Sequence, residues 1–295
     1  MSSDHTTPEY GIVERLTPGI RRVLAHNPGP FTYQGTGTYL VGNGEVAVID
    51  PGPSIPSHVD NILSALEPRE VITHILITHT HADHSPAARL LKARTNAATF
   101  GFGPHGGSAD ETDSMEAGID RDFTPDFELL DGECLRTENW EIEAVHTPGH
   151  CSNHLCFAYL DENTLFCGDH LMAWSTTVIL PPDGNVRDYL QSLEKLAHRN
   201  ESTYWPTHGP SIVEPHQYID QIMSHRRQRI DQIRSSLKNA PATLSELRKA
   251  LYPEIPTRLY TAAEYSILAS IGYLTEEGDV ICQSPNKRDS MFLAV

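Results

Sequence analysis

Three histidines and one aspartate fall within six residues of the stretch Thr-His-Thr-His-Ala-Asp-His, from Thr78 to His84. Neutral imidazole nitrogens and carboxylate oxygens are the ligands that suit zinc and the neighbouring first-row metals. A histidine-rich surface loop is the alternative, but such a loop does not usually follow a buried strand and pair with single histidines downstream. We therefore interpret this stretch as part of a metal site.

The residues on either side of the cluster predict how it is held. The run from Val71 to Ile77 is mostly apolar and β-branched, which predicts a buried strand covered on both faces. The segment 85–95 has the composition of a helix. The cluster is therefore expected on a strand-to-helix loop, where a rigid sheet positions ligands and leaves them open to solvent.

Four further segments place a residue able to bind metal just after an apolar strand. These residues are Asp50 after Ala47-Val48-Ile49, His150 in the segment 146–150, Asp169 in the segment 166–170, and His208 in the segment 206–210. Asp50 is either a turn residue or an acceptor that holds a ligand histidine, because metal-bound imidazoles commonly donate their second N–H to a carboxylate.

In order and in separation, the five segments resemble the five motifs of the metallo-β-lactamase superfamily, over roughly residues 35–210. The resemblance implies an α/β fold, an αββα sandwich with a dinuclear site at one edge. It implies two divalent cations, zinc in the first instance, although the same ligands accept manganese or iron. In the implied ligand scheme, His79, His81 and His150 hold the first ion, Asp83, His84 and His208 hold the second, Asp169 bridges both, and Asp50 supports a ligand from behind. A mononuclear site with idle neighbours is the alternative.

This ligand set predicts hydrolysis. Two cations that share a water lower its pKa from 15.7 towards about 7, which gives a metal-bridging hydroxide at neutral pH. Asp83 and His84 are the expected catalytic residues, and Asp83 can orient the nucleophile while it remains a ligand. His170, Ser175 and Thr176 follow the bridging position and are candidate substrate contacts. Aspartate rather than cysteine at position 169 resembles the hydrolase branches of the family and argues against β-lactams as substrates.

Short strands and amphipathic helices alternate over the first 210 residues and predict a layered α/β domain. The expected strands are 38–41, 45–49, 71–77, 97–102, 140–145, 154–159, 164–167 and 203–205, and the expected helices are 58–66, 85–95 and 186–198. We expect a catalytic domain over residues 1–222 and a winged-helix-like domain over 223–295. The second domain would contain helices over 219–237, 244–252 and 262–271, then a hairpin over 273–281 with Gly278-Asp279 at its turn.

The segments Arg226–Ile230, Thr243–Leu247 and Ile271–Leu274 resemble the winged-helix domain of the lactamase-beta-like-2 proteins. Characterised vertebrate members of that branch cleave single-stranded RNA, and related fungal members hydrolyse polyketide thioesters on acyl carrier proteins. The resemblance therefore implies an ester, thioester or lactone on a small or carrier-linked substrate, with single-stranded RNA as the alternative. A non-catalytic winged-helix regulator is a third reading, which the complete ligand set disfavours.

Charge favours the small or carrier-linked substrate. The net charge is −17, and ten acidic residues face one arginine between Asp110 and Glu133, where we expect a solvated acidic loop. Between His225 and Arg258 there are eight Lys or Arg against three acids, a weak cue for RNA. The N-terminus lacks a secretory pattern, and no apolar run approaches the roughly 18 residues of a membrane span, so we expect a cytoplasmic protein with no membrane partner. The sequence does not decide whether the chain forms a homodimer.

Overall fold

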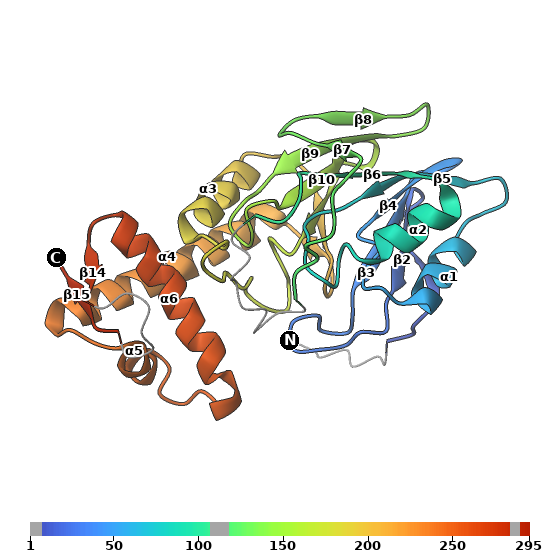
Figure 1. The fold of residues 1–295 in the computed structure, drawn as a ribbon. Helices are drawn as coiled ribbons and strands as arrows, with labels where there is room; N and C mark the ends of the chain where they lie inside the picture. Colours follow the sequence, from blue (N-terminus) through green and yellow to red (C-terminus); the bar gives the residue numbers. More distant parts are fainter. Residues whose placement is uncertain (1–7, 107–117, 284–289) are drawn as a thin grey trace.

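The computed structural model describes residues 8–106, 118–283 and 290–295, without the side chain of Arg258 (Figure 1). Over these residues the strands form two large sheets and one small sheet, and six α-helices accompany them. The expected mixed α/β class is confirmed.

The first sheet contains seven strands. Their order is β1 (Val13–Arg15), β2 (Ile20–Leu24), β3 (Gly37–Val41), β4 (Glu45–Ile49), β5 (Val71–Leu76), β6 (Ala98–Gly101) and β7 (Phe127–Glu128). The first four strands pair antiparallel, whereas β4, β5, β6 and β7 run parallel. Helix α1 (Pro56–Ser64) joins β4 to β5 and helix α2 (Ala87–Thr95) joins β5 to β6, because parallel neighbours need a crossover.

The second sheet contains six strands. Their order is β13 (Ile212–Val213), β12 (Thr203–Pro206), β11 (Thr164–Gly168), β10 (Leu155–Tyr159), β9 (Glu141–His146) and β8 (Cys134–Arg136). Helix α3 (Val186–Ala197) connects the parallel pair β11 and β12. It begins where the side chain of Asn185 accepts hydrogen bonds from the backbone N–H groups of Arg187 and Asp188.

Strand β4 shows how the sheets and helices form layers. Val46 and Val48 pack with α1 and α2 on the outer face of the first sheet, whereas Ala47 and Ile49 face the second sheet. This alternation follows from the two-residue period of a strand, and both faces are apolar because both are covered. On the far side, Leu193 of α3 packs against the second sheet. The sequence of layers is helix, sheet, sheet, helix.

The candidate ligands meet because their strands point the same way. Strands β4 and β5 are parallel, and so are β11 and β12. Strand β9 is antiparallel to β10, which is antiparallel to β11, so β9 ends at the same edge as β11. The residues that follow these strands are Asp50, the cluster 78–84, His150, Asp169 and His208. The expectation that each metal-competent residue follows a strand is confirmed.

Three helices and a two-stranded sheet complete the chain. They are α4 (Pro215–Asn239), α5 (Leu244–Leu251), α6 (Tyr260–Glu276), β14 (Val280–Cys282) and β15 (Phe292–Ala294). The predicted hairpin over 273–281 is wrong, because α6 continues to Glu276 and β14 pairs with β15 instead. Burial decides this difference: Leu274 is fully buried on the inner face of α6, which extends the helix beyond its predicted end.

Helix α4 shares a hydrophobic core with the second sheet. Ile219 and Ile230 belong to the same buried cluster as Leu193 of α3 and Tyr204 of β12. Figure 1 shows α4 running from the sheets to the C-terminal helices. The predicted domain boundary between residues 222 and 223 falls inside this helix and stays a prediction.

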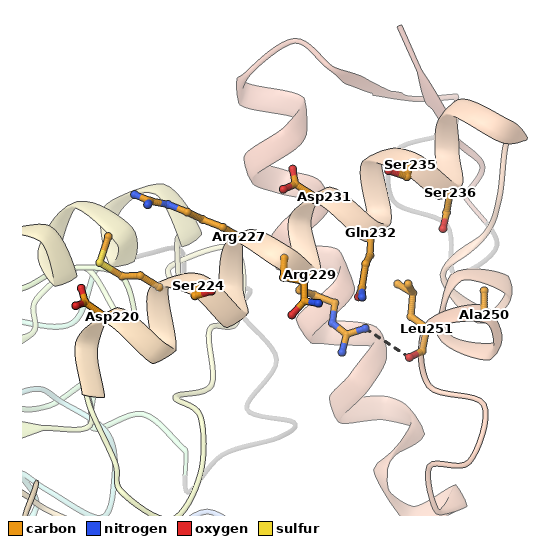
Figure 2. Close-up of a pocket in the computed structure, with 12 residues that line it drawn as sticks. Asp220, Ser224, Arg227, Arg229, Asp231, Gln232, Ser235, Ser236, Ala250 and Leu251 are labelled. Carbon is orange, nitrogen blue, oxygen red and sulfur yellow. Dashed lines mark hydrogen bonds between the residues drawn. The ribbon is translucent and has the colours of Figure 1, made fainter. Parts of the chain in front are cut away.

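A hollow of about 900 Å³ lies between α4 and α5 (Figure 2). Its lining is mostly polar, and Arg229 Nη1 crosses it to donate to the carbonyl of Leu251 at 3.4 Å. None of the candidate metal ligands lines it. Among the described residues, no helix is both long enough and apolar enough to cross a membrane.

Candidate metal centre

Three imidazole nitrogens converge from two loops. Nε2 of His79 lies 2.9 Å from Nδ1 of His81, and Nε2 of His150 lies 3.1 Å from the same Nδ1. All three residues are buried. Three imidazole nitrogens that face one point form a ligand set typical of zinc.

A second group lies beside the first and contains Asp83, His84 and His208. Oδ2 of Asp83 lies 3.0 Å from Nε2 of His208 and 3.6 Å from Nε2 of His84. The carboxylate of Asp169 reaches the same two rings, with Oδ2 3.5 Å from His84 Nε2 and Oδ1 3.5 Å from His208 Nε2. Ligand atoms of His79, His84 and Asp169 also lie within 4.8 Å of one another, so Asp169 stands between the two groups.

The unpaired atoms of this cluster fit metal ions. Among the described residues, His84 Nε2, His208 Nε2 and Asp169 Oδ1 are buried and form no hydrogen bond of suitable geometry, although Asp83 Oδ2 lies 3.0 Å from His208 Nε2. A buried polar atom without a partner costs about 1–3 kcal/mol, and three such atoms directed into one space are unusual unless something binds them. Imidazole nitrogens and carboxylate oxygens are suitable donors for divalent first-row cations.

Asp50 holds the cluster from behind. Its Oδ2 accepts hydrogen bonds from Nδ1 of His84 at 2.9 Å, from Oγ1 of Thr78 at 2.7 Å and from Oγ1 of Thr207 at 2.9 Å. Its Oδ1 accepts from the backbone N–H of Thr78 at 2.8 Å. The backbone of Asp50 has φ of 48°, which is unusual for a residue other than glycine. The carboxylate therefore joins the loops that carry His79, His84 and His208.

The other rings are also fixed through their outer nitrogens. Nδ1 of His150 donates to the carbonyl of Val178 at 2.7 Å, and Nδ1 of His208 donates to the carbonyl of Gly35 at 3.1 Å. Such partners set the tautomer and direct the remaining nitrogen towards a metal. Sequence reasoning anticipated a carboxylate partner at Asp50 but missed these backbone acceptors, because carbonyl groups leave no mark in a sequence.

His154 is a further residue that sequence reasoning missed. It is fully buried, and its Nε2 accepts the backbone N–H of Asp169 at 3.2 Å while its Nδ1 bonds Oγ1 of Thr147 at 2.9 Å. The sequence placed His154 inside a strand, where a lone histidine gives no signal. The structure makes it a support for Asp169.

The sequence profile of the metallo-beta-lactamase superfamily matches residues 32–208, a span that contains every candidate ligand. The chain belongs to the metallo-β-lactamase superfamily.

Similar proteins agree with this assignment. The "Atrochrysone carboxyl ACP thioesterase" of Aspergillus chevalieri is 33% identical over 259 residues, covering 84% of this chain and 78% of that protein. The "Beta-lactamase-like protein 2 homolog" of Drosophila melanogaster is 32% identical over 279 residues, covering 90% and 91%. A beta-lactamase domain protein from Burkholderia ambifaria shares the fold, with a TM-score of 0.81 at 18% identity over 99% of this chain and 96% of that chain. The chain is thus a hydrolase of the superfamily, with histidine and aspartate groups able to bind metal ions.

The pKa values of His79 and His84 in this metallo-β-lactamase-type site are shifted in opposite directions. Burial, followed by the neighbouring imidazoles, lowers the pKa of His79 well below its usual value, so its ring is neutral and available as a ligand. Burial also lowers the pKa of His84, but the carboxylates of Asp83, Asp169 and Asp50 outweigh it and raise that pKa well above 6.5. Burial raises the pKa of Asp83, and His84 and His208 reverse this effect and lower it to about 2. Asp83 is therefore ionised at neutral pH.

A narrow cavity of about 20 Å³ opens beside the ligands of this hydrolase. Its walls combine ligands with apolar side chains, namely Phe31, His81, Asp83, His150, Asp169, Met172 and Val178. The candidate substrate contacts lie elsewhere in the loop after Asp169. His170 is fully buried with its ring 4.6 Å from that of Tyr189, and Ser175 and Thr176 do not line the cavity. Their contact with substrate stays a prediction.

The acidic segment differs in part from the expectation of a solvated loop. Residues 110–117 lie outside the described residues. Asp120 packs against the loop 78–84, since its backbone N–H donates to the carbonyl of Thr80 at 2.8 Å, whereas most residues from 126 to 133 are exposed. Asp120 is buried, and its carboxylate accepts hydrogen bonds from Ser85 at 2.8 Å and Arg89 at 3.1 Å. These two donors compensate the loss of water and allow the acid to be buried.

Proposed function

We propose that this protein is a dinuclear metal-dependent hydrolase of carboxylic esters or thioesters, on a small or carrier-linked substrate. The observation that carries the proposal is the pair of ligand groups joined by Asp169 beside a cavity with apolar walls. His79, His81 and His150 would hold one cation, and Asp83, His84 and His208 would hold the other. Zinc fits these donors, and manganese and iron are alternatives.

Two divalent cations held there would supply Lewis acidity and lower the pKa of a water molecule between them. The residues of the chain would contribute orientation and charge. Asp83 is ionised and reaches the rings of both His84 and His208, so it can orient an attacking water by accepting a hydrogen bond from it. Asp50 would keep His84 directed at the site.

The composition of the cavity supports an acyl substrate. Phe31, Met172 and Val178 place apolar side chains beside the candidate ligands, and because the cavity of about 20 Å³ has room for about one water molecule, an acyl group would contact these side chains from its mouth. Among its described lining residues there is no lysine or arginine, the side chains that RNA-binding proteins use along the phosphate backbone. Together with the net charge of −17, this favours an uncharged ester or thioester over single-stranded RNA.

The C-terminal part supports a carrier-linked substrate less directly. One similar protein is named as an acyl-carrier-protein thioesterase. We infer a winged-helix-like arrangement from the order of α4, α5, α6 and the sheet of β14 and β15, which Ala242 extends through two backbone hydrogen bonds to Phe292 of 3.1 and 3.0 Å. Such a module could contact a carrier or a second copy of the chain.

A panel assay tests the function. The protein is loaded with Zn²⁺, Mn²⁺ or Fe²⁺, its bound metal is quantified, and it is assayed with acyl-N-acetylcysteamine thioesters, p-nitrophenyl esters, lactones, a bis-aryl phosphodiester and an unstructured RNA. We expect two ions per chain and turnover of thioesters or esters. Cleavage of RNA that falls steeply with salt, with no thioester turnover, would replace this proposal by the ribonuclease alternative.

Matched variants separate the site from contaminating activity. Asp169→Asn keeps the shape of the side chain but removes the charge between the two groups, so we expect it to abolish turnover of any substrate found. Asp60→Asn alters an exposed aspartate that pairs with Arg94 on the surface, and it should leave turnover unchanged. Full activity of Asp169→Asn would refute the assignment.

A further inference from the structure

Arg226 of α4 is a buried cation that belongs to neither ligand group. It is only 8% exposed, and one guanidinium nitrogen, Nη2, donates to the backbone carbonyl of Thr177. Its Cζ lies 5.1 Å from the centroid of the Tyr189 ring on α3. Its Nε is buried and has no hydrogen-bond partner among the described residues. Because burial of a charged guanidinium costs free energy of hydration, we expect this side chain to have a specific role.

Thr177 closes the loop that follows Asp169. Its Oγ1 lies 2.9 Å from the carbonyl oxygens of both Asp169 and His170 and donates to this pair. The hydroxyl of Tyr189 donates to the same carbonyl of His170 at 3.0 Å. Arg226 and Tyr189, which contact each other, therefore hold the loop from outside at Thr177 and His170.

The next residue of the loop contacts a candidate ligand. Nδ1 of His150 donates to the carbonyl of Val178 at 2.7 Å, and this bond directs Nε2 of the ring towards His81. The carbonyl that Arg226 binds and the carbonyl that His150 binds belong to consecutive residues, so they cannot move independently. Disturbing a carbonyl that orients a ligand histidine commonly changes the affinity of the site for its metal.

We propose that Arg226 is a positioning residue through which helix α4 sets the cation affinity of the group formed by His79, His81 and His150. This inference rests on the proposed metal-dependent function. Arginine suits the position because its planar guanidinium can lie over an aromatic ring and donate a hydrogen bond at the same time. Lysine would keep the charge and one donor but would lose the planar contact with Tyr189.

Three variants test the role of Arg226 in the full-length chain. Arg226→Met removes both the donor and the charge at similar length, and Arg226→Lys restores a donor. Arg227→Met is the matched control, since Arg227 is the next residue of α4 (Figure 2), is exposed and pairs with Glu194 of α3. A fourth variant, Ile233→Val, weakens the buried face of α4 away from the loop. This variant shows how a loss of stability alone affects Zn²⁺ affinity and hydrogen exchange.

Zn²⁺ affinity is measured for each variant by competition with a chelator, and hydrogen exchange of segment 169–180 is measured in the metal-free protein. We expect Arg226→Met to weaken the binding of one of two Zn²⁺ ions by about 10–100-fold and to speed exchange of the segment, with partial recovery in Arg226→Lys. Arg227→Met and Ile233→Val should keep both affinities. Unchanged Zn²⁺ affinity in Arg226→Met, or an equal loss in Ile233→Val, would overturn the inference.

The two measurements separate this inference from the proposed function. If the wild-type chain binds fewer than two ions, the dinuclear function fails. Exchange in the metal-free protein still decides whether Arg226 holds the loop: faster exchange in Arg226→Met than in Arg227→Met supports the inference, and equal exchange refutes it.

Discussion

His84 donates its Nδ1–H to Oδ2 of Asp50 at 2.9 Å, with both side chains fully buried. This bond leaves Nε2 of His84 as the atom that faces Asp83 and Asp169. Asp50 adopts a left-handed backbone conformation at the end of β4, which places its carboxylate under the metal loop instead of along the strand. The pair of Asp50 and His84 therefore connects β4 of the first sheet to the candidate metal site.

The first prediction concerns this pair. Asp50→Asn replaces an acceptor by an amide that carries donors, so at least one of the bonds from His84, Thr78 and Thr207 is lost. We expect the Zn²⁺ affinity to fall by about 10–100-fold, as is typical when a residue that supports a metal ligand is replaced. Chelator competition measures it, with Asp60→Asn as the surface control. Wild-type affinity in Asp50→Asn would show that other contacts orient His84.

The second prediction concerns pH and His58. Burial lowers the pKa of His58 to about 4. Its Nε2 bonds Oγ1 of Thr38 at 2.8 Å, while Nδ1 is buried with no partner among the described residues. Between pH of about 6.5 and about 4, His58 is therefore protonated in the unfolded chain but neutral in the native protein. The free energy of unfolding falls as the pH drops through this range.

His58→Gln should remove this contribution. The loss attributable to His58 amounts to about 3 kcal/mol over that range. Urea unfolding of the metal-free protein at a series of pH values measures it, and His216→Gln on an exposed position of α4 is the control. An identical pH slope in His58→Gln and wild type would contradict the prediction.

The third prediction concerns the buried pair of Arg21 and Glu70. The guanidinium forms two bonds to the carboxylate, of 2.6 and 3.0 Å, and both side chains are almost completely buried. Burial raises the pKa of Glu70, but the hydrogen bonds from Arg21 outweigh this effect and lower it. The stability contributed by Glu70 is present above its unfolded pKa and is lost as the pH falls through its lower native pKa.

Removing one partner of this pair leaves an uncompensated buried charge. We expect Glu70→Gln to lower the free energy of unfolding by about 3 kcal/mol. Glu67→Gln breaks a nearby pair with Arg15 that is more than half exposed, and it should cost less than about 1 kcal/mol. Chemical denaturation measures both. Equal effects of the two variants would contradict the importance of burial.

The fourth prediction compares two glycines. Gly149 has φ of 137°, and a Cβ there would lie 2.3 Å from the Cα of Tyr189 in α3. Gly149→Ala must displace α3 or the loop that carries His150, so we expect reduced stability and weaker metal binding. Gly272 lies within α6 with open space around it, and Gly272→Ala should stabilise the protein by about 0.5–1 kcal/mol. Thermal unfolding and metal titration test both. A stabilising effect of Gly149→Ala would refute the close contact.

The types of the candidate metal ligands and the layered α/β class could be predicted from the amino-acid sequence. Spacing within 78–84 and a polar residue after each apolar strand suffice for that, because strand periodicity and ligand chemistry are local properties. Most strands and helices up to residue 210 follow from the same local pattern, but β1, β2, β7 and β8 were not predicted. The end of α6 at Glu276 does not follow from that pattern either, since it depends on what Leu274 packs against.

The residues that support the candidate ligands could not be predicted from the sequence. His154 beneath Asp169, the carbonyl of Val178 on His150 and Arg226 on Thr177 join segments that lie far apart or carry no distinctive side chain. The same holds for Phe31, which reaches the cavity from the loop between β2 and β3. Such contacts depend on how the two large sheets and the surrounding helices pack, and packing is a property of the whole chain. The candidate ligands can therefore be predicted from the sequence, whereas the orientation of their side chains and the walls of the cavity depend on the fold.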